Sequence, residues 1–369
     1  MLYSITLNRN CNFSCNYCYQ SQKRSSVMSE EVMEKTINFI EQHINANGIK
    51  NYSFSISGGE CFLYFDKILY LLNLINKKID DTKIKKLVDI STNASLLTEE
   101  KIKILKNYNV SLYIGFDGIK KMQEKNRFYV NKKTSFWECL KNIDTCYKMI
   151  DKNNITINFV ITNNNFKYAY KTFKFLATRY SPCNISFSIA YNSDWTTKEI
   201  KDLKYPLIKI SKKYIKMLNK NPLFSIKLID KHVSDFIYET NENSICGAGK
   251  EQFSITPEGH IIACSNSVGM KSESIFYIGN IYSGIKTGLL KEFNSNLQKN
   301  INHSDCRKCV YKNRCYTYCP VSNYLASNDS FTISEKMCSL NKILLEVTDN
   351  FIKLLYKKNQ TLFQKKYLN

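Results

Sequence analysis

Strand and helix patterns alternate from the first residues to about residue 190, and this alternation constrains the fold more than any other feature of the chain. Tyr52, Phe54 and Ile56 alternate with serines, a period of two that predicts a strand. The predicted strands are residues 2–7, 52–57, 87–92, 110–116, 155–161 and 185–190. Helical stretches lie between them, so the sequence predicts six βα units.

Two of the predicted helices carry start signals. Ser29 is expected to cap the first, which has Glu30 and Glu31 in its opening turn. A capping box is expected from Ser135 to Glu138 at the start of another. The first helix places one apolar face toward the core: Met33, Ile37, Ile40 and Ile44.

Repeated βα units predict a parallel sheet whose functional residues gather at the C-terminal ends of the strands. Six units make an incomplete barrel that is open on one side and can admit a bulky substrate. We therefore predict an α/β fold, a partial (β/α)6 TIM barrel over residues 1–193.

The rest of the chain differs in pattern. Residues 194–245 are helical and basic and are interpreted as a bridge, whereas residues 246–338 are cysteine-rich and irregular. Turns are expected at residues 246–249 and at Pro257-Glu258-Gly259. Residues 339–369 are expected to form a C-terminal helix with one apolar face: Leu340, Ile343, Leu344, Val347, Phe351 and Leu354.

Composition limits the cellular setting. The 369 residues contain no apolar run long enough to span a bilayer and no basic segment followed by an apolar one at the start. We expect a cytoplasmic protein without a membrane partner. Fourteen cysteines in such a chain indicate metal ligands or reduced thiols rather than a disulfide framework.

The net charge of +21 has two interpretations. It can attract an acidic partner, such as a nucleic acid or an acidic peptide. It can also reflect a composition rich in Lys, Asn, Ile and Tyr, which we favour because the basic residues are spread along helices. We do not expect a nucleic-acid partner. The pairs Lys357-Lys358 and Lys365-Lys366 can still help to hold an acidic substrate.

Three cysteines follow the first predicted strand directly. Cys11, Cys15 and Cys18 have C-x3-C-x2-C spacing, so three thiolates can ligate three corners of a [4Fe–4S] cube. The four-cysteine ferredoxin run has a different spacing and closes the last corner. An iron without a protein ligand is a binding place for a substrate or cofactor. The alternative is a structural zinc knuckle, but no fourth Cys or His follows at ligand spacing.

The next three predicted strands also end in polar or glycine-rich turns. The second ends in Ser57-Gly58-Gly59-Glu60, where glycines let backbone approach a ligand and a carboxylate can accept hydrogen bonds from an ammonium group. The third ends in Ser91-Thr92-Asn93-Ala94. The fourth ends in Gly115-Phe116-Asp117-Gly118 and is followed by Asn126-Arg127.

These features together resemble the radical S-adenosylmethionine (radical SAM) enzymes, whose fold is a partial barrel. The resemblance implies that the free iron chelates AdoMet and cleaves it reductively to a 5′-deoxyadenosyl radical. It also implies the AdoMet contacts Tyr17, Gly58, Gly59, Glu60, Asn93 and Arg127. This chain departs from the family at three positions: Cys61 replaces a usual Pro, Ala94 a Gly, and Gly115 a common Ser that contacts AdoMet.

A second cysteine set lies in the C-terminal third. It begins with Cys246 and Cys264, which enclose Gly259, with twelve residues between the first cysteine and Gly259 and four between Gly259 and the second. A C-x2-C-x5-C-x3-C run follows, and Cys338 ends the set. The pattern resembles the SPASM domain of radical SAM peptide and protein modifiers, which holds two auxiliary [4Fe–4S] clusters. The resemblance implies one cluster on Cys306, Cys309, Cys315 and Cys338, and another on Cys246, Cys264 and Cys319.

Some relatives insert a further cysteine between the positions of Cys246 and Cys264, and this chain has none there. If no other residue substitutes, an iron of that cluster is free to bind a substrate thiolate, which would be held deprotonated.

The remaining candidates are assigned more plainly. Cys139 and Cys146 lie on one helix face and are interpreted as core residues, Cys61 as a packing substitution, and Cys183 is assigned nothing. The histidines are too scattered for a catalytic pair: His43, His232, His260 and His303. The catalytic base is unassigned, with Asp117, Glu251 and Glu258 as equal candidates.

The resemblance implies an enzyme with AdoMet and three [4Fe–4S] clusters, served by an electron donor such as ferredoxin or flavodoxin. The leading substrate is a ribosomally made, cysteine-containing peptide that becomes cross-linked through a thioether. Because the barrel begins almost at Met1, leader recognition would need a separate binding protein or the basic C-terminal region.

Two alternatives stay open. One is an anaerobic sulfatase maturase that converts Ser or Cys to formylglycine. The other is a non-catalytic zinc or iron–sulfur protein that binds nucleic acid.

Overall fold

The structure is a computed structural model that describes residues 1–20, 25–79, 87–181, 184–238, 247–301 and 304–368. The chain divides into two compact units. The first comprises Met1–Gly115, Arg127–Ile155 and Gly247–Asn296, and the second Phe116–Asn126, Thr156–Cys246 and Leu297–Asn369. Each unit is described by itself. The boundaries of the domains in the sequence analysis remain a prediction.

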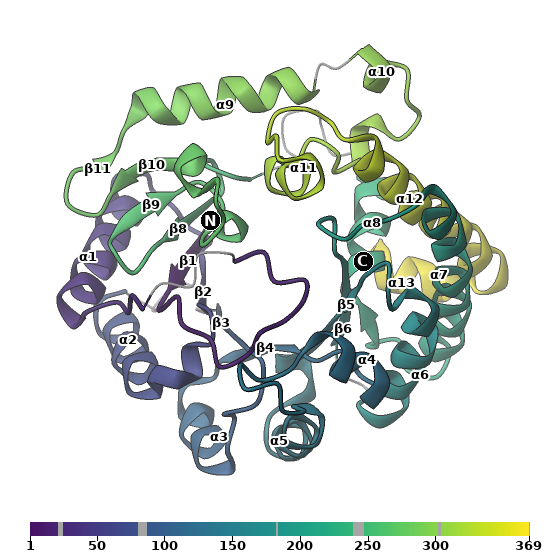
Figure 1. Cartoon of the computed structure of the whole chain (residues 1–369), viewed down its shortest axis with the longest axis horizontal. Helices are drawn as coiled ribbons and strands as arrows, with labels where there is room; N and C mark the ends of the chain where they lie inside the picture. The colour runs from purple at the N-terminus through teal and green to yellow at the C-terminus, as the bar shows by residue number, and fades with distance from the viewer. Residues whose placement is uncertain (21–24, 80–86, 182–183, 239–246, 302–303, 369) are drawn as a thin grey trace. The chain divides into compact units, whose positions relative to one another are not determined.

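The first unit is built on a mixed sheet with the strand order β11-β10-β9-β8-β1-β2-β3-β4 (Figure 1). Strands β8, β1, β2, β3 and β4 run parallel, and β9, β10 and β11 add to the β8 edge as antiparallel strands. Its strands are β1 (Leu2–Thr6), β2 (Ser53–Ser57), β3 (Leu87–Thr92), β4 (Ser111–Gly115), β8 (Gln252–Ile255), β9 (His260–Ile262), β10 (Tyr277–Asn280) and β11 (Gly284–Ile285).

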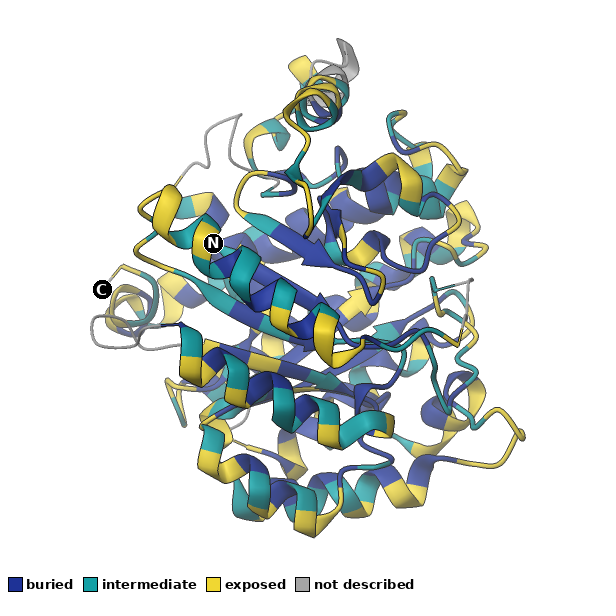
Figure 2. Cartoon of the chain, turned by 90° about the vertical axis from the view of Figure 1, so that its left-hand side faces the viewer, coloured by how far each residue is buried: buried dark blue, intermediate teal, exposed yellow. Residues whose placement is uncertain are grey.

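The helices of this unit cover one side of the sheet. They are α1 (Glu30–Ala46), α2 (Phe65–Lys78), α3 (Glu99–Leu105), α5 (Phe136–Met149) and the first part of α9 (Thr287–Ile301). In Figure 2, α1 and α2 carry exposed residues on the side that faces the viewer. Their buried faces meet strands whose own apolar side chains are fully covered, among them Tyr3, Ile5, Phe54 and Ile56. The core of the unit therefore lies between sheet and helices.

The second unit has a small parallel sheet in the order β5-β6-β7 and a layer of long helices (Figure 1). Helices α7 and α12 contact each other extensively, and Tyr214 of α7 stacks on Phe351 of α12 with ring centroids 5.1 Å apart. The elements are α4 (Lys120–Asn126), β5 (Ile155–Ile161), α6 (Ala169–Arg179), β6 (Asn184–Ile189), α7 (Thr197–Leu218), β7 (Ser225–Ile226), α8 (Lys227–Ile237), α10 (Ser304–Arg307), α11 (Pro320–Ser327), α12 (Glu335–Lys358) and α13 (Gln360–Tyr367).

The secondary structure confirms most of the sequence expectations. All six predicted strands form, and Ser29 caps α1 by accepting a hydrogen bond from Val32 N–H. The turn at Pro257-Glu258-Gly259 also forms, with Gly259 at a left-handed φ of +81°. The mostly parallel, open α/β arrangement agrees with the predicted fold class.

The predicted capping box is wrong. Helix α5 does begin after Ser135, but the Ser135 side chain makes no capping hydrogen bond. The Ser135 hydroxyl donates instead to the carbonyl of Arg127 at 2.6 Å, and the Glu138 carboxylate accepts from Tyr129. Both groups of the expected capping box therefore bind residues of the segment before the helix, eight and nine positions away, instead of each other. In the part of the chain that the structure describes, no helix is long and apolar enough to cross a membrane.

Candidate active site

The cysteine triplet lies on a loop, residues 9–26, that follows β1 and is closed at its base. The N–H of Arg9 donates to the Ser26 carbonyl at 3.0 Å, and that of Met28 donates to Leu7 at 2.8 Å. Cys11 and Cys15 are partly exposed and Cys18 is exposed. The three thiols are thus presented on a loop with anchored ends, while residues 21–24 lie outside the described part.

Gly58 and Gly59 lie directly against the beginning of this loop. A Cβ atom at Gly58 would lie 2.3 Å from Asn8 Oδ1, and one at Gly59 only 2.2 Å from the Asn10 carbonyl oxygen. The Gly59 N–H donates to the Asn8 carbonyl and that of Glu60 to the Asn10 carbonyl, at 3.0 and 2.8 Å. Both positions therefore require glycine, because Asn8 lies against Gly58 and the Asn10 backbone lies against Gly59.

Glu60 joins the ends of β2 and β3. Its carboxylate accepts hydrogen bonds from Thr92 Oγ1 and from the backbone N–H of Asn93, both at 2.7 Å, and from the Phe62 N–H at 3.2 Å. Burial raises the pKa of Glu60, and these hydrogen bonds oppose the increase. Glu60 is only 1% exposed, so its first role is to hold two strand ends together.

A chain of amide and hydroxyl groups connects the end of β3 to the cysteine loop. Asn93 Nδ2 donates to Asn12 Oδ1 at 2.9 Å, and Asn12 Nδ2 donates to Ser95 Oγ at 2.8 Å. From α5, the Cys139 thiol donates to the Asn93 carbonyl at 3.2 Å. Asn12 and Ser95 were missed by the sequence analysis. Their only signal is that each lies one or two residues from a motif residue.

Arg127 lies between the end of β4 and the same loop. Its Nη1 donates to the Tyr17 hydroxyl at 2.9 Å, and its guanidinium carbon is 5.8 Å from the centre of the Phe13 ring. A Cβ atom on Gly115 would lie 2.8 Å from Arg127 Nη2. The guanidinium therefore fills the space that a side chain at position 115 would need, which gives a physical reason for the glycine.

The residues present fit an iron–sulfur cluster and AdoMet. Three thiols on one anchored loop lie beside a cation, amide groups and the ends of three parallel strands, which is a donor set suited to both groups. Among the described residues, no three His, Cys, Asp or Glu side chains converge as ligands of a single metal ion. A cubic cluster binds each thiolate through a different iron atom, so such convergence is not required.

Three further cysteines are buried core residues, as predicted. Cys61, Cys139 and Cys146 are completely covered, and burial raises the pKa of each thiol. The Cys61 thiol donates to the Ser91 carbonyl at 3.1 Å. Packing therefore explains these residues, including the one that replaces the usual proline.

In the second unit, cysteines of the predicted auxiliary set lie near one another. Burial raises the pKa of the Cys315 thiol, hydrogen bonds with Thr317 oppose the increase, and the nearby thiols Cys338 and Cys309 add to it. Arg314, the residue before Cys315, forms a bidentate ion pair with Asp349 of α12, in which Nη2 donates to Oδ2 at 2.7 Å. This agrees with a shared site for part of the set.

The structure does not test the other predicted ligand set. Cys246 lies outside the described residues, as does Cys183, while Cys264 belongs to the first unit and Cys319 to the second. Cys264 is mostly buried at the end of β9, and its carbonyl accepts from the Ser267 hydroxyl at 2.7 Å. Its assignment remains a prediction.

The candidate bases differ in environment. Asp117 is fully buried in the second unit, where its carboxylate accepts from the Val160 N–H at 3.0 Å. Burial raises the pKa of Glu258, but hydrogen bonds from Arg9, Ser26 and Thr256 outweigh it and lower the pKa to about 2. A carboxylate held in this way is a poor proton acceptor near neutral pH. Glu251 is exposed.

One of the basic C-terminal residues has a structural role. Lys366 donates to the carbonyls of Pro222 and Phe224 at 3.2 and 3.0 Å, and burial lowers its pKa. Lys366 thus has structural partners, and its predicted part in holding an acidic substrate stays a prediction. Lys357, Lys358 and Lys365 are exposed.

Known proteins resemble this chain in sequence. Residues 5–176 match the Radical SAM superfamily model. The chain is 27% identical over 341 residues to the cysteine-type anaerobic sulfatase-maturating enzyme of Clostridium novyi, covering 84% of this chain and 85% of the relative. It is 26% identical over 374 residues to the radical SAM cyclopropyl synthase TigE of Paramaledivibacter caminithermalis, covering 92% and 72%.

Solved structures share the fold. Native anSMEcpe with bound AdoMet superposes with a TM-score of 0.78 at 20% identity, covering 97% of this chain and 100% of that one. Streptococcus suis SuiB bound to its precursor peptide SuiA gives a TM-score of 0.62 at 17% identity, covering 91% and 75%. A radical SAM domain implies an iron–sulfur cluster and AdoMet, and enzyme relatives leave no support for a non-catalytic protein. The chain therefore carries a radical SAM domain at residues 5–176, and its similarity to radical SAM maturases over most of its length indicates an enzyme.

Proposed function

We propose that this enzyme is a maturase that oxidises a cysteine-containing, ribosomally made peptide and joins the cysteine sulfur to carbon as a thioether. One observation carries the proposal: the set Cys246, Cys264 and Cys319 has no fourth cysteine in its sequence pattern. Cys61, Cys139 and Cys146, the described cysteines outside the two predicted sets and the triplet, are buried in packing. An iron without a protein ligand would bind a substrate thiolate and keep it deprotonated.

The first site would generate the oxidant. Cys11, Cys15 and Cys18 would hold the cluster, and the bound cluster and AdoMet supply a 5′-deoxyadenosyl radical that abstracts hydrogen from the substrate. Arg127 and Tyr17 would orient the cofactor from one side, while Asn93, Glu60 and the backbone of Gly58 and Gly59 would border it on the other. The anchored loop supports this division, because backbone hydrogen bonds join its two ends.

The auxiliary region would complete the oxidation. Cys306, Cys309, Cys315 and Cys338 would hold one further [4Fe–4S] cluster, and the three-cysteine set another. The first assignment is supported by the closeness of Cys309 and Cys338 to Cys315, whose thiol pKa they help to raise. A ferredoxin or flavodoxin would donate the electron, and a separate protein or the exposed C-terminal lysines would bind a leader peptide.

Relatives that act on peptides support the substrate class. SuiB was solved with its precursor peptide SuiA, and anSMEcpe with the Kp18Cys and Cp18Cys peptides, so two proteins of this fold bind peptides. TigE, a cyclopropyl synthase, matches 92% of this chain. These similarities extend past the radical SAM domain into the cysteine-rich region.

A second candidate is oxidation of a protein Cys or Ser to formylglycine. The extent of the similarity favours it, because this chain matches 85% of the length of the Clostridium novyi sulfatase-maturating enzyme and the whole length of anSMEcpe.

Mass spectrometry separates the two candidates. The reconstituted enzyme would be given the short peptide encoded beside its gene and, separately, a sulfatase-derived peptide with its target cysteine. A thioether removes two hydrogens and one alkylatable thiol without creating a carbonyl. Formylglycine formation from cysteine removes the sulfur and leaves an aldehyde that reacts with a hydrazide. Absence of 5′-deoxyadenosine with dithionite and AdoMet would contradict both candidates.

A further inference from the structure

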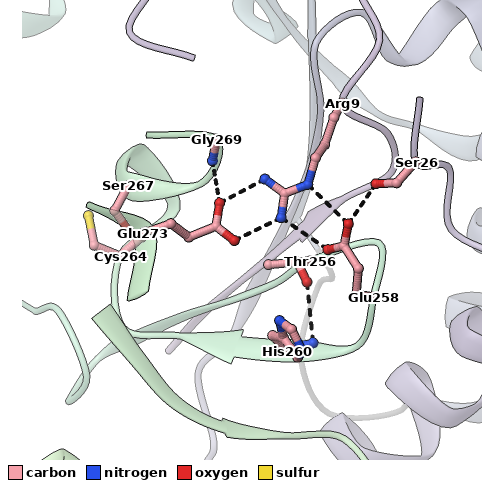
Figure 3. A network of polar contacts seen from close by, with 9 residues as sticks. All are labelled: Arg9, Ser26, Thr256, Glu258, His260, Cys264, Ser267, Gly269 and Glu273. Atoms are coloured by element: carbon pink, nitrogen blue, oxygen red, sulfur yellow. Dashed lines mark hydrogen bonds and ion pairs between the residues drawn. The ribbon is translucent and has the colours of Figure 1, made fainter. Parts of the chain in front are cut away.

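Arg9 is a buried cation at the beginning of the cysteine loop. It is 6% exposed, and its guanidinium faces two carboxylates (Figure 3). Nε and Nη2 donate to the two oxygens of Glu258 at 3.1 and 3.0 Å, and Nη1 and Nη2 donate to those of Glu273 at 2.7 and 2.8 Å. Both pairs are bidentate, the strongest and most directional geometry for such an interaction.

Each carboxylate contacts a second group. Glu258, in the turn between β8 and β9, accepts from the Ser26 hydroxyl at 2.7 Å, and Ser26 in turn accepts the Arg9 N–H. Glu258 therefore binds both ends of the cysteine loop. Glu273 accepts from the Gly269 N–H, within the segment that begins at Cys264. One guanidinium thus connects the loop of the first cluster to the segment of a predicted auxiliary ligand.

The cysteine loop also contacts the segment after Cys264 at a second place, beyond Cys18. A Cβ atom on Gly269 would lie 3.1 Å from Cγ of Gln20, two residues after Cys18. The segment that follows Cys264 therefore borders the cysteine triplet at both its beginning and its end.

We propose that Arg9, Glu258 and Glu273 form a positioning element, here called the Arg9 clamp, that fixes the loop of Cys11, Cys15 and Cys18 against the Cys264 segment. Buried ion pairs add little net stability, because desolvation opposes the Coulomb attraction. Separating the partners would leave a buried charge without compensation, so such a pair holds the two segments that carry it in one arrangement. The clamp acts on the first cluster indirectly, because it fixes the loop that carries the three cysteine ligands. The proposal rests on the cluster assignment in the proposed function but not on the substrate.

The test is an AdoMet titration of the dithionite-reduced holoenzyme followed by electron paramagnetic resonance. The spectral change on adding AdoMet isolates the cluster that binds it, whatever other clusters are present. Loss of an outer partner of metal ligands costs about 10–100-fold in affinity or activity, so we expect about 10-fold more AdoMet at the midpoint for Glu273→Gln. Arg9→Lys should behave similarly, because a single ammonium group cannot bind both carboxylates bidentately.

Asp349→Asn is the matched control. It weakens another partly buried bidentate pair, Arg314–Asp349, whose side chains are 12% and 23% exposed. We expect its AdoMet midpoint to equal that of wild type even where its melting temperature falls. Wild-type midpoints in both Glu273→Gln and Arg9→Lys would overturn the clamp. A wild-type enzyme without any AdoMet response would instead overturn the cluster assignment, and the clamp with it.

Hydrogen–deuterium exchange of the full-length apoprotein gives a second readout that needs no cluster. Glu273→Gln should speed exchange in residues 8–20, more than 250 positions away in sequence, relative to Asp349→Asn. Unchanged exchange there would also contradict the proposal.

Discussion

The two cysteine-rich regions of this enzyme are held in different ways. The loop of Cys11, Cys15 and Cys18 depends on strand ends, because backbone N–H groups of Gly59 and Glu60 donate to carbonyls at its beginning. The region around Cys315 depends on side chains from helices instead. There Arg314 pairs with Asp349, and Tyr316 donates to Asp235 of α8.

This difference bears on how each region responds to metal. Parallel strand ends are fixed by a ladder of hydrogen bonds, so a loop tied to them is positioned before a cluster binds. Segments held by a few side chains gain more of their order from the metal itself, because metal binding is coupled to folding. The first region should therefore be preorganised, and the second should depend more on its cluster.

The largest expected effect separates the two regions by chemistry. Cys15→Ala should abolish formation of 5′-deoxyadenosine, because the first cluster would lose one of its three thiolates. Cys309→Ala should retain much of this cleavage. Chromatographic quantification of 5′-deoxyadenosine with dithionite and AdoMet measures both. Equal cleavage by wild type and Cys15→Ala would refute the assignment of the first cluster.

Gly59→Ala tests the preorganisation of the first region. The new methyl group would collide with the Asn10 carbonyl at 2.2 Å, and neither backbone can move without displacing the loop. Overpacking of this kind costs about 3 kcal/mol, and we expect a matching loss of iron at the first site. The control is Gly288→Ala, where nothing lies within 4 Å. Apoprotein melting and iron content of the reconstituted protein are the measurements, and equal values for both variants would contradict the account.

The second region should be acid-sensitive through His232. Burial lowers the pKa of His232 from 6.5 to about 4, and its ring lies 5.4 Å from that of Tyr316. Between these pH values the unfolded state binds more protons than the folded state, so stability falls as pH falls, by up to about 3 kcal/mol. Denaturant unfolding at several pH values should show this slope in wild type and a reduced slope in His232→Phe. The same slope in both would argue against His232.

Breaking the Arg314 pair probes the side-chain support of the second region. Asp349→Asn should lower the free energy of unfolding by about 2 kcal/mol, since hydrogen bonds to charged groups contribute this much when partly buried. Glu346→Gln removes a more exposed pair with Lys204 and should cost less than about 1 kcal/mol. Denaturant midpoints rank the two variants, and a larger loss for Glu346→Gln would reverse the interpretation.

The smallest effect concerns a strand end of the first region. Ala94 has a left-handed φ of +65°, which costs a residue with a Cβ about 1–2 kcal/mol. Ala94→Gly removes that cost but adds chain entropy to the unfolded state and deletes a buried methyl group. We expect a net change within about 1 kcal/mol by thermal unfolding. A large destabilisation would mean that the methyl packing dominates.

Local pattern was enough to predict the six strands and the cysteine loop after the first of them. Strand alternation, an N-cap such as Ser29 and ligand spacing are properties of neighbouring residues, so they can be recognised from sequence alone. The capping box at Ser135 fails for the opposite reason: its hydroxyl has a better partner in the Arg127 carbonyl, which no local pattern reveals.

The sequence by itself therefore determined the βα order, the thiols available to a first cluster and the family to which they point. Only the tertiary structure decided that β8 pairs in parallel with β1, which brings Glu258 and Glu273 to Arg9 across about 250 residues. It also decided that Arg127 fills the space above Gly115. The reason is physical: strand pairing and buried charge depend on which surfaces meet, and that choice is made by the whole chain.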